Sequence, residues 1–225
     1  GSITGKVTRA SDGAALANVG VSAATAASGS GWAYGYATTD ANGAYTITDL
    51  PEGTYTVAFS SQENFVDQDW NNKPSGSGKG DVVKVVAGVT TKGINAAMVA
   101  GGQISGKVTR AADGAPVGGV WISVEGADTR KSASTNDDGT YTVGGLPAGS
   151  YTVSFSPPDD LVAQDWNNKP SGSNGSDVVT VTLGKTTTGI NAALVAAGTI
   201  SGKVTRATDG QPVEVVERWQ VVEAG

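Results

Sequence analysis

Three aromatic residues alternate along one short segment of the chain, within the string GWAYGYAT. Trp32, Tyr34 and Tyr36 share one parity, so on an extended strand they lie on a single face. A row of exposed rings can stack on the faces of sugars or dock on a neighbouring protein. The alternative is that the rings cover a sheet edge or pack at a junction between modules. These residues are the first candidate platform for a ligand.

A second group of candidates lies in the string QDWNNKPSGS, which occurs twice. Its aromatic ring, two amides and lysine could hydrogen-bond to a polyol. The same residues could instead form a structural crossover, in which the amides satisfy loop backbone groups. We favour the structural interpretation and keep the following as secondary candidates: Trp70, Asn71, Asn72, Trp166, Asn167 and Asn168.

Several acidic turns offer oxygen atoms that could bind a cation. Asp40, Asn42 and Asp49 form one such group, and Asp137 with Asp138 forms another. Calcium takes six to eight oxygen ligands, more than these short turns supply. Turn geometry alone accounts for Asp and Asn at such positions. We therefore expect no metal site.

The composition removes most catalytic chemistry. The 225 residues include no His and no Cys, so the commonest general base, disulfides and thiolate metal sites are excluded. No serine stands in a nucleophile elbow, and no glycine loop precedes a helix to cradle phosphate. Asp67 and Asp69 are the nearest approach to paired carboxylates, and neighbours of that kind are usually solvated. We expect no catalytic residue and no cofactor, and hence no enzyme.

Charge and hydropathy limit the partners. The net charge of −6 comes from scattered acids without a basic stripe, which argues against nucleic acid. No apolar run approaches the roughly 20 residues needed to cross a bilayer, so no membrane insertion is expected.

An internal repeat defines the units that position these residues. ITGKVTRA begins at Ile3, and ISGKVTRA begins at Ile104 and again at Ile200, at offsets of 101 and 96 residues. The first copy has five extra residues beside its aromatic segment, and Trp121 of the second copy replaces Gly20 at an outward position, which makes it a further candidate. We predict a first β-sandwich repeat over 1–100, a second over 101–197, and a truncated third over 198–225 with one strand, one turn and a divergent tail.

Alternating residues separated by turn signals predict an all-β fold. In the first copy we expect strands near 3–10, 19–25, 33–39, 44–48, 54–60, 81–87 and 92–99. Period two assigns the inward face of both copies: Ile3, Val7, Val19, Val21, Tyr45, Ile47, Leu50, Tyr55, Val57, Phe59, Val83, Val85, Ile94, Ala96 and Met98, then Ile104, Val108, Val120, Ile122, Val124, Tyr141, Val143, Leu146, Tyr151, Val153, Phe155, Val179, Val181, Ile190 and Leu194.

The strings ISGKVTRAADGAPVGGVWISV, NDDGTYTVGGLPAGSYTVSFS and TTTGINAAL resemble carboxypeptidase regulatory-like domains, close in style to the B-type repeats of collagen-binding surface adhesins. The resemblance implies tandem prealbumin-like, or Ig-like, β-sandwiches of about seven strands each, within a carbohydrate-binding-like superfamily and without peptidase chemistry. The adhesin relatives carry a Lys–Asn isopeptide bond, for which Lys6 with Asn95 and Lys107 with Asn191 are the natural pairs. Parity places these pairs toward solvent, which argues against the bond.

Such modules occur in secreted bacterial proteins as stalks or as accessories to hydrolases. We therefore expect a monomeric, non-catalytic structural or adhesion array, a stalk or spacer, that is extracellular and either secreted or attached to the cell wall. The alternative is a carbohydrate-binding accessory module of a secreted glycoside hydrolase. The expected partner is a polysaccharide or another surface protein.

Overall fold

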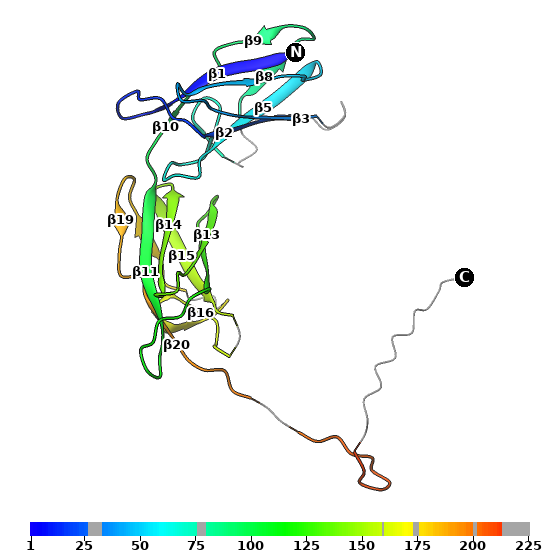
Figure 1. The fold of residues 1–225 in the computed structure, drawn as a ribbon, viewed down its shortest axis with the longest axis vertical. Coiled ribbons are helices and arrows are strands. Elements are labelled where there is room, and N and C mark those ends of the chain that lie inside the picture. Colours follow the sequence, from blue (N-terminus) through cyan, green and yellow to red (C-terminus); the bar gives the residue numbers. More distant parts are fainter. Residues whose placement is uncertain (27–32, 76–79, 159, 173–175, 200–201, 213–225) are drawn as a thin grey trace, which may run out of the picture.

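The computed structural model describes residues 1–26, 33–75, 80–158, 160–172, 176–199 and 202–212. Within these ranges the chain consists of strands and turns, with one short 3-10 helix, η1, at Trp166–Asn168. Two β-sandwiches follow one another along the chain (Figure 1). The predicted all-β sandwich fold is confirmed.

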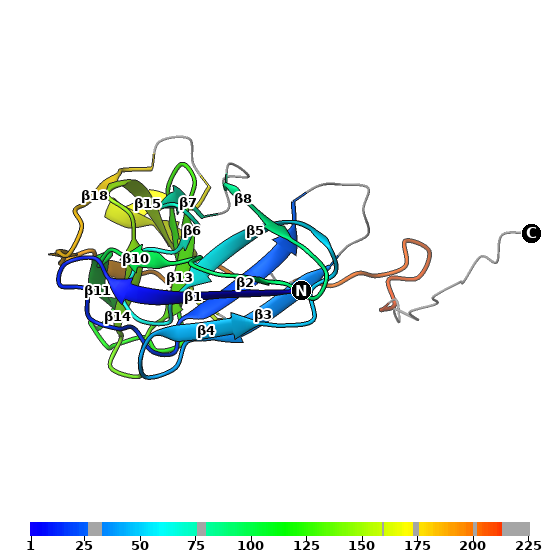
Figure 2. The ribbon, with the colours of Figure 1, turned by 90° about the horizontal axis from the view of Figure 1, so that it is seen from above.

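The first sandwich packs a four-stranded sheet against a six-stranded sheet (Figures 1 and 2). The smaller sheet contains β1 (Ser2–Arg9), β4 (Ala44–Ile47), β9 (Thr90–Thr91) and β10 (Ala96–Met98), with β1 in the centre. The larger sheet runs in the order β3 (Tyr34–Thr38), β2 (Gly20–Thr25), β5 (Gly53–Ser60), β6 (Gln68–Asp69) and β7 (Lys73–Pro74), and β8 (Val82–Val85) also pairs with β5.

The second sandwich repeats this arrangement strand for strand. Its smaller sheet contains β11 (Gly102–Arg110), β14 (Thr140–Leu146), β19 (Thr186–Thr187) and β20 (Ala192–Leu194). Its larger sheet runs β13 (Arg130–Ser134), β12 (Trp121–Glu125), β15 (Gly149–Ser156), β16 (Gln164–Asp165) and β17 (Lys169–Pro170), with β18 (Val179–Val181) also on β15.

Each sandwich buries a core of its own. Every residue that the alternation assigned to the inward face is buried, so that prediction is confirmed. In each core a tyrosine of the smaller sheet meets a phenylalanine of the larger one edge to face: Tyr45 with Phe59 and Tyr141 with Phe155, both at 6.0 Å between ring centroids. Such contacts add to the apolar burial that holds the two sheets together.

The strand predicted near 92–99 is shorter than expected. Within this range only Ala96–Met98 form a strand, β10; the short strand β9 ends before it at Thr91, and Gly93 between the two has a positive φ of 80°. Both strands are parallel to β1. Between the two strands the Ile94 carbonyl passes directly over Gly5 and accepts a hydrogen bond from the Tyr45 hydroxyl at 2.7 Å. We call this close approach the crossing point; its counterpart in the second sandwich joins Gly106, Tyr141 and Ile190.

The sequence analysis also did not predict a short hairpin. In each copy the QDWNNKP segment forms two two-residue strands, β6 with β7 and β16 with β17, which extend the larger sheet.

The described part of the third copy, residues 202–212, forms a turn. Thr205 bridges to Pro212, as Thr8 does to Ala15 and Thr109 to Pro116. No sheet of the second sandwich includes these residues (Figure 1). The divergent tail lies outside the described residues.

Candidate functional site at the outer sheet face and the module junction

The aromatic platform lies on β3, an edge strand of the larger sheet in the first sandwich. Tyr34 and Tyr36 both point outward and are 53% and 58% exposed, so they share one face, as their parity predicted. Trp32 lies outside the described residues. The described part of the platform is therefore a pair of tyrosines.

The two sandwiches place a ring over the same spot of this outer face, but from different strands. A Cβ on Gly20 of β2 would lie 2.9 Å from the Tyr36 hydroxyl, so the Tyr36 ring covers that glycine. In the second copy the aligned position is occupied by Trp121 itself, which is 51% exposed. A serine neighbours each position on the adjacent strand, Ser60 and Ser156. Ring and hydroxyl together are suited to a polyol.

The Asn residues of the QDWNNKPSGS segment serve its turn. Asn71 and Asn72 have positive φ of 62° and 58°, a conformation that Asn tolerates better than most residues. The Asn71 side-chain amide donates to Asp81 at 2.8 Å, and Asn72 accepts from Gln68 at 3.1 Å. Trp70 packs against the core.

The second copy repeats this geometry. Asn167 donates to Asp177 at 2.9 Å, and Asn168 accepts from Gln164 at 3.3 Å. Trp166 packs on the second core as Trp70 does on the first. The arrangement favours the structural interpretation of these secondary candidates.

The expectation that Asp69 is solvated is wrong. Asp69 and its counterpart Asp165 are buried in the larger sheet, with 7% and 3% exposure. Burial raises the pKa of the Asp69 carboxyl, and a hydrogen bond from Ser75 partly opposes that shift. Asp165 accepts a hydrogen bond from Ser176, whereas its Oδ1 has no partner among the described residues.

The oxygens of the acidic turns are used by the turns themselves. Asp40 accepts hydrogen bonds from the backbone of Asn42 and Ala44, both at 2.8 Å. Hydrogen bonds from Thr140, first from its side chain, lower the pKa of the exposed Asp138 carboxyl. Within the described ranges no three acidic side chains gather as metal ligands would.

The module junction is built on a linker of three residues, Val99–Gly101, between β10 and β11. Residues 61–67 of the first sandwich, which we call the docking loop, pair with this linker. Phe65 bridges to Ala100, the Val66 amide donates to Val99 at 2.9 Å, and the Gly101 amide donates to Asn64 at 3.0 Å. Because the linker is hydrogen-bonded along its length, it is not a free tether.

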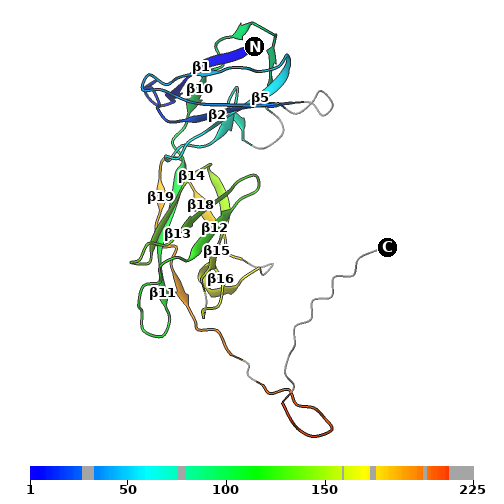
Figure 3. The same cartoon turned by 45° about the vertical axis from the view of Figure 1, so that its right-hand side comes forward.

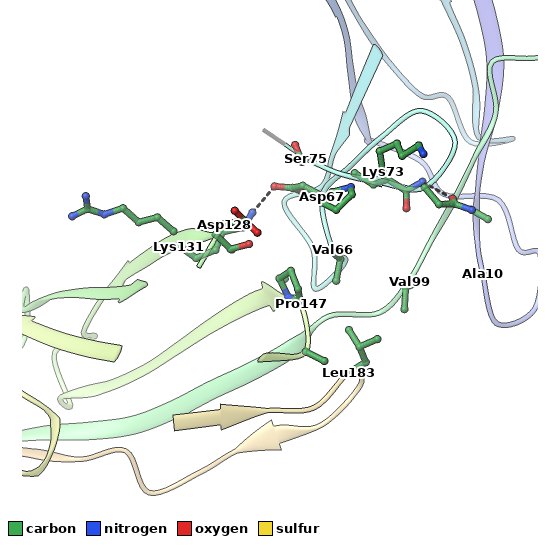
Figure 4. Close-up of a pocket in the computed structure, with 18 residues that line it drawn as sticks. Ala10, Val66, Asp67, Lys73, Ser75, Val99, Asp128, Lys131, Pro147 and Leu183 are labelled. Atoms are coloured by element: carbon green, nitrogen blue, oxygen red, sulfur yellow. Dashed lines mark hydrogen bonds and ion pairs between the residues drawn. The ribbon is translucent and has the colours of Figure 1, made fainter. Parts of the chain in front are cut away.

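The docking loop also contacts the second sandwich. We call Lys131, Gly144 and Gly145 the corner of that sandwich. The Asn64 side chain donates to the Gly101 carbonyl at 2.9 Å and accepts from the Gly145 amide at 2.7 Å. Asp67 forms a half-buried ion pair with Lys131 at 2.5 Å (Figure 4).

A groove of about 590 Å³ lies beside this ion pair and is lined by both sandwiches (Figure 4). Val66 and Val99 line it from the first sandwich and linker, and Pro147 and Leu183 from the second. The groove is therefore a feature of the module junction.

Comparison with known families decides what these sandwiches are. The model of the carboxypeptidase regulatory-like domain family matches residues 2–69 and 103–195. The chain belongs to this family. No curated protein matches the chain. No helix in the described residues is long and apolar enough to cross a membrane.

Several solved structures align with these tandem carboxypeptidase regulatory-like domains at low identity. The minor pilin GBS52 of Streptococcus agalactiae is 13% identical over 90% of this chain and 99% of its own, with a TM-score of 0.42. The shaft pilin spaA of Lactobacillus rhamnosus GG is 9% identical over 89% and 98%, with a TM-score of 0.39. The Bacillus anthracis TIE protein is 14% identical over 87% of this chain, which spans only 34% of that protein, with a TM-score of 0.35.

The Lys–Asn pairs of these regulatory-like domains lie on the solvent side, as parity predicted. Lys6 and Asn95 are exposed, while Val7 and Ile94 are buried. The Asn95 side-chain oxygen accepts a hydrogen bond from the Lys6 backbone amide at 2.8 Å. Asn95 thereby fills the gap in backbone pairing between β9 and β10.

Proposed function

We propose that this chain is a non-catalytic stalk or adhesion array of a secreted or cell-surface bacterial protein. The observation that carries the proposal is the module junction, where a three-residue linker is held by hydrogen bonds on both sides. A stalk must keep its end at a fixed distance, and short restrained linkers limit reorientation. The family match supports the proposal, since it is to a regulatory-like domain.

The stalk proposal predicts an elongated monomer in solution. Small-angle X-ray scattering should give a distance distribution with a long tail, and light scattering should give the mass of one 22.4 kDa chain. Residues 1–197 alone should give the same two-sandwich profile without the C-terminal segment. A compact particle with the radius of a single globular domain would contradict the proposal.

A second candidate function is polysaccharide binding by an accessory module of a secreted glycoside hydrolase. The observation that favours it is the ring that each copy places over the same outer spot, Tyr36 in one and Trp121 in the other. Exposed rings flanked by hydroxyls are suited to sugar faces.

The polysaccharide proposal predicts retarded migration in affinity gels containing starch, cellulose, chitin or xylan. If one glycan retards the protein, Tyr36→Ala and Trp121→Ala together should abolish most of the retardation, because both rings are lost. Val178→Ala, which removes an equally exposed aliphatic side chain elsewhere, is the matched control. Migration unaffected by all four glycans would exclude this function for these ligands.

A further inference from the structure

The docking loop differs between the two copies at the residues that make the junction. Asn64 and Asp67 align with Asp160 and Ala163 in the second sandwich, at the offset of 96 residues. The backbone pairing of the loop with the following linker is nevertheless repeated. The Val162 amide donates to Val195 at 2.9 Å, as Val66 does to Val99. The two copies therefore share the backbone hydrogen bonds between the loop and the linker that follows. They differ in the side chains that the loop presents to the next module.

The side chain at position 64 must both donate and accept. Asn64 donates to the Gly101 carbonyl and accepts from the Gly145 amide, which uses the two ends of one carboxamide. An ionised aspartate, as at position 160, can only accept. An alanine at the position of Asp67 would leave Lys131 without its partner across the junction. The loop of the second copy therefore cannot make this set of contacts.

The corner also differs between the copies, at the positions that face the docking loop. Gly144 and Gly145 align with Thr48 and Asp49 of the first sandwich. A Cβ on Gly144 would lie 2.9 Å from the Asn64 side-chain oxygen, and one on Gly145 would lie 2.9 Å from the Phe65 carbonyl. Gly145 and Asp49 both have positive φ, at 70° and 61°, so the backbone bend is common to both copies. What the second copy lacks is the side chains that would obstruct the docking loop.

Lysine at position 131 completes the corner. It aligns with Gly35 of the first sandwich, which has no side chain to offer. Its exposed fraction of 29%, and that of 24% for Asp67, shows that the ion pair is partly shielded from water. Partial burial strengthens such a pair relative to a fully exposed one.

We propose that the docking loop and the corner form an interface specific to this junction, which sets the orientation of the second sandwich relative to the first. The partner that the loop Ser61–Asp67 fits is a following β-sandwich module with two glycines at its corner and a lysine at the position of Lys131. The peptide linker fixes the order of the two modules, and this interface fixes the angle between them. This inference rests on the proposed stalk function and adds a recognition step to it.

Exchanging aligned residues between the copies tests the proposal without introducing foreign side chains. Asn64→Asp with Asp67→Ala gives the first loop the residues of the second, and Gly145→Asp gives the corner the residue of the first copy. Asp160→Asn, in the equivalent loop of the second sandwich between β15 and β16, is the matched control. Residual dipolar couplings then report whether the two sandwiches share one alignment tensor.

The wild-type protein and Asp160→Asn should show one shared tensor, and both interface variants should show two different tensors. Thermal unfolding of each sandwich, followed by amide cross-peaks, verifies that both remain folded in every variant. Two independent tensors in the wild type, or a shared tensor in both interface variants, would overturn the interface. The scattering profile distinguishes failure of this inference from failure of the stalk proposal. An elongated wild-type particle with two independent alignment tensors contradicts only the interface. A compact particle contradicts the stalk.

Discussion

Replacing Gly106 with alanine is expected to lower the free energy of unfolding of the second sandwich by about 3 kcal/mol or more. A Cβ at this position would overlap the Ile190 carbonyl oxygen and would lie 3.0 Å from the Tyr141 ring. The obstacle is backbone, so no side-chain rotation relieves it. The strand must move away from the crossing point, and the buried hydrogen bond from Tyr141 to Ile190, now 2.6 Å, is lost with it.

Urea unfolding followed by hydrogen exchange of peptides from each sandwich measures this effect. Gly149→Ala is the control, because a Cβ there meets nothing closer than 3.6 Å and the backbone has no positive φ. The first sandwich should unfold at an unchanged midpoint in both variants. A Gly106→Ala protein as stable as the Gly149→Ala protein would show that the crossing point is looser than described.

Alkaline pH is expected to destabilise both sandwiches through their core tyrosines. Burial raises the pKa of the Tyr45 and Tyr141 hydroxyls above the ordinary value near 10. Below pH 10 the hydroxyls are protonated in both states and contribute no pH dependence. Above it the unfolded chain loses these protons first, so stability falls as pH rises, by about 1.4 kcal/mol per pH unit for each tyrosine.

Unfolding free energies between pH 8 and pH 11.5 measure this slope. Tyr141→Phe should reduce the slope of the second sandwich, in which burial also raises the pKa of Tyr151, and leave that of the first, which keeps Tyr45, unchanged. The same variant should be less stable at pH 8 by about 1–3 kcal/mol, because the buried Ile190 carbonyl loses its donor. An identical slope with and without the Tyr141 hydroxyl would rule out this cause.

Alternation along the chain was sufficient to predict the cores, because one face of each long strand is buried. It predicted Tyr45 and Phe59 as inward residues, although they meet from different sheets. It did not predict where the strand within 92–99 begins, because the path there depends on the fit of the Ile94 carbonyl over Gly5 rather than on any periodicity. Contacts of that kind join residues far apart in the chain and leave no local pattern.

The junction was not predicted, for a related reason. The sequence around Asn64 and Asp67 is typical of a solvated turn. No local pattern indicates that these residues contact Lys131 or Gly145. A position-by-position comparison of the two copies could have revealed the junction, because Thr48 and Asp49 of the first copy align with two glycines in the second. The outer-face candidates were easier, since parity placed Tyr34 and Tyr36 on one face of a strand, and both are exposed on that face.

The parallel pairing of the first and last strands has a mechanical consequence. β1 lies beside β10 over residues 7–9 (Figure 3), and β11 lies beside β20 over residues 108–110 (Figure 1), so each sandwich begins and ends on adjacent parallel strands. Tension applied through the linkers pulls these strands in opposite directions along their length. The hydrogen bonds between them are then loaded together in shear, instead of opening one after another. A protein that is pulled from its ends would meet this resistance first in every sandwich.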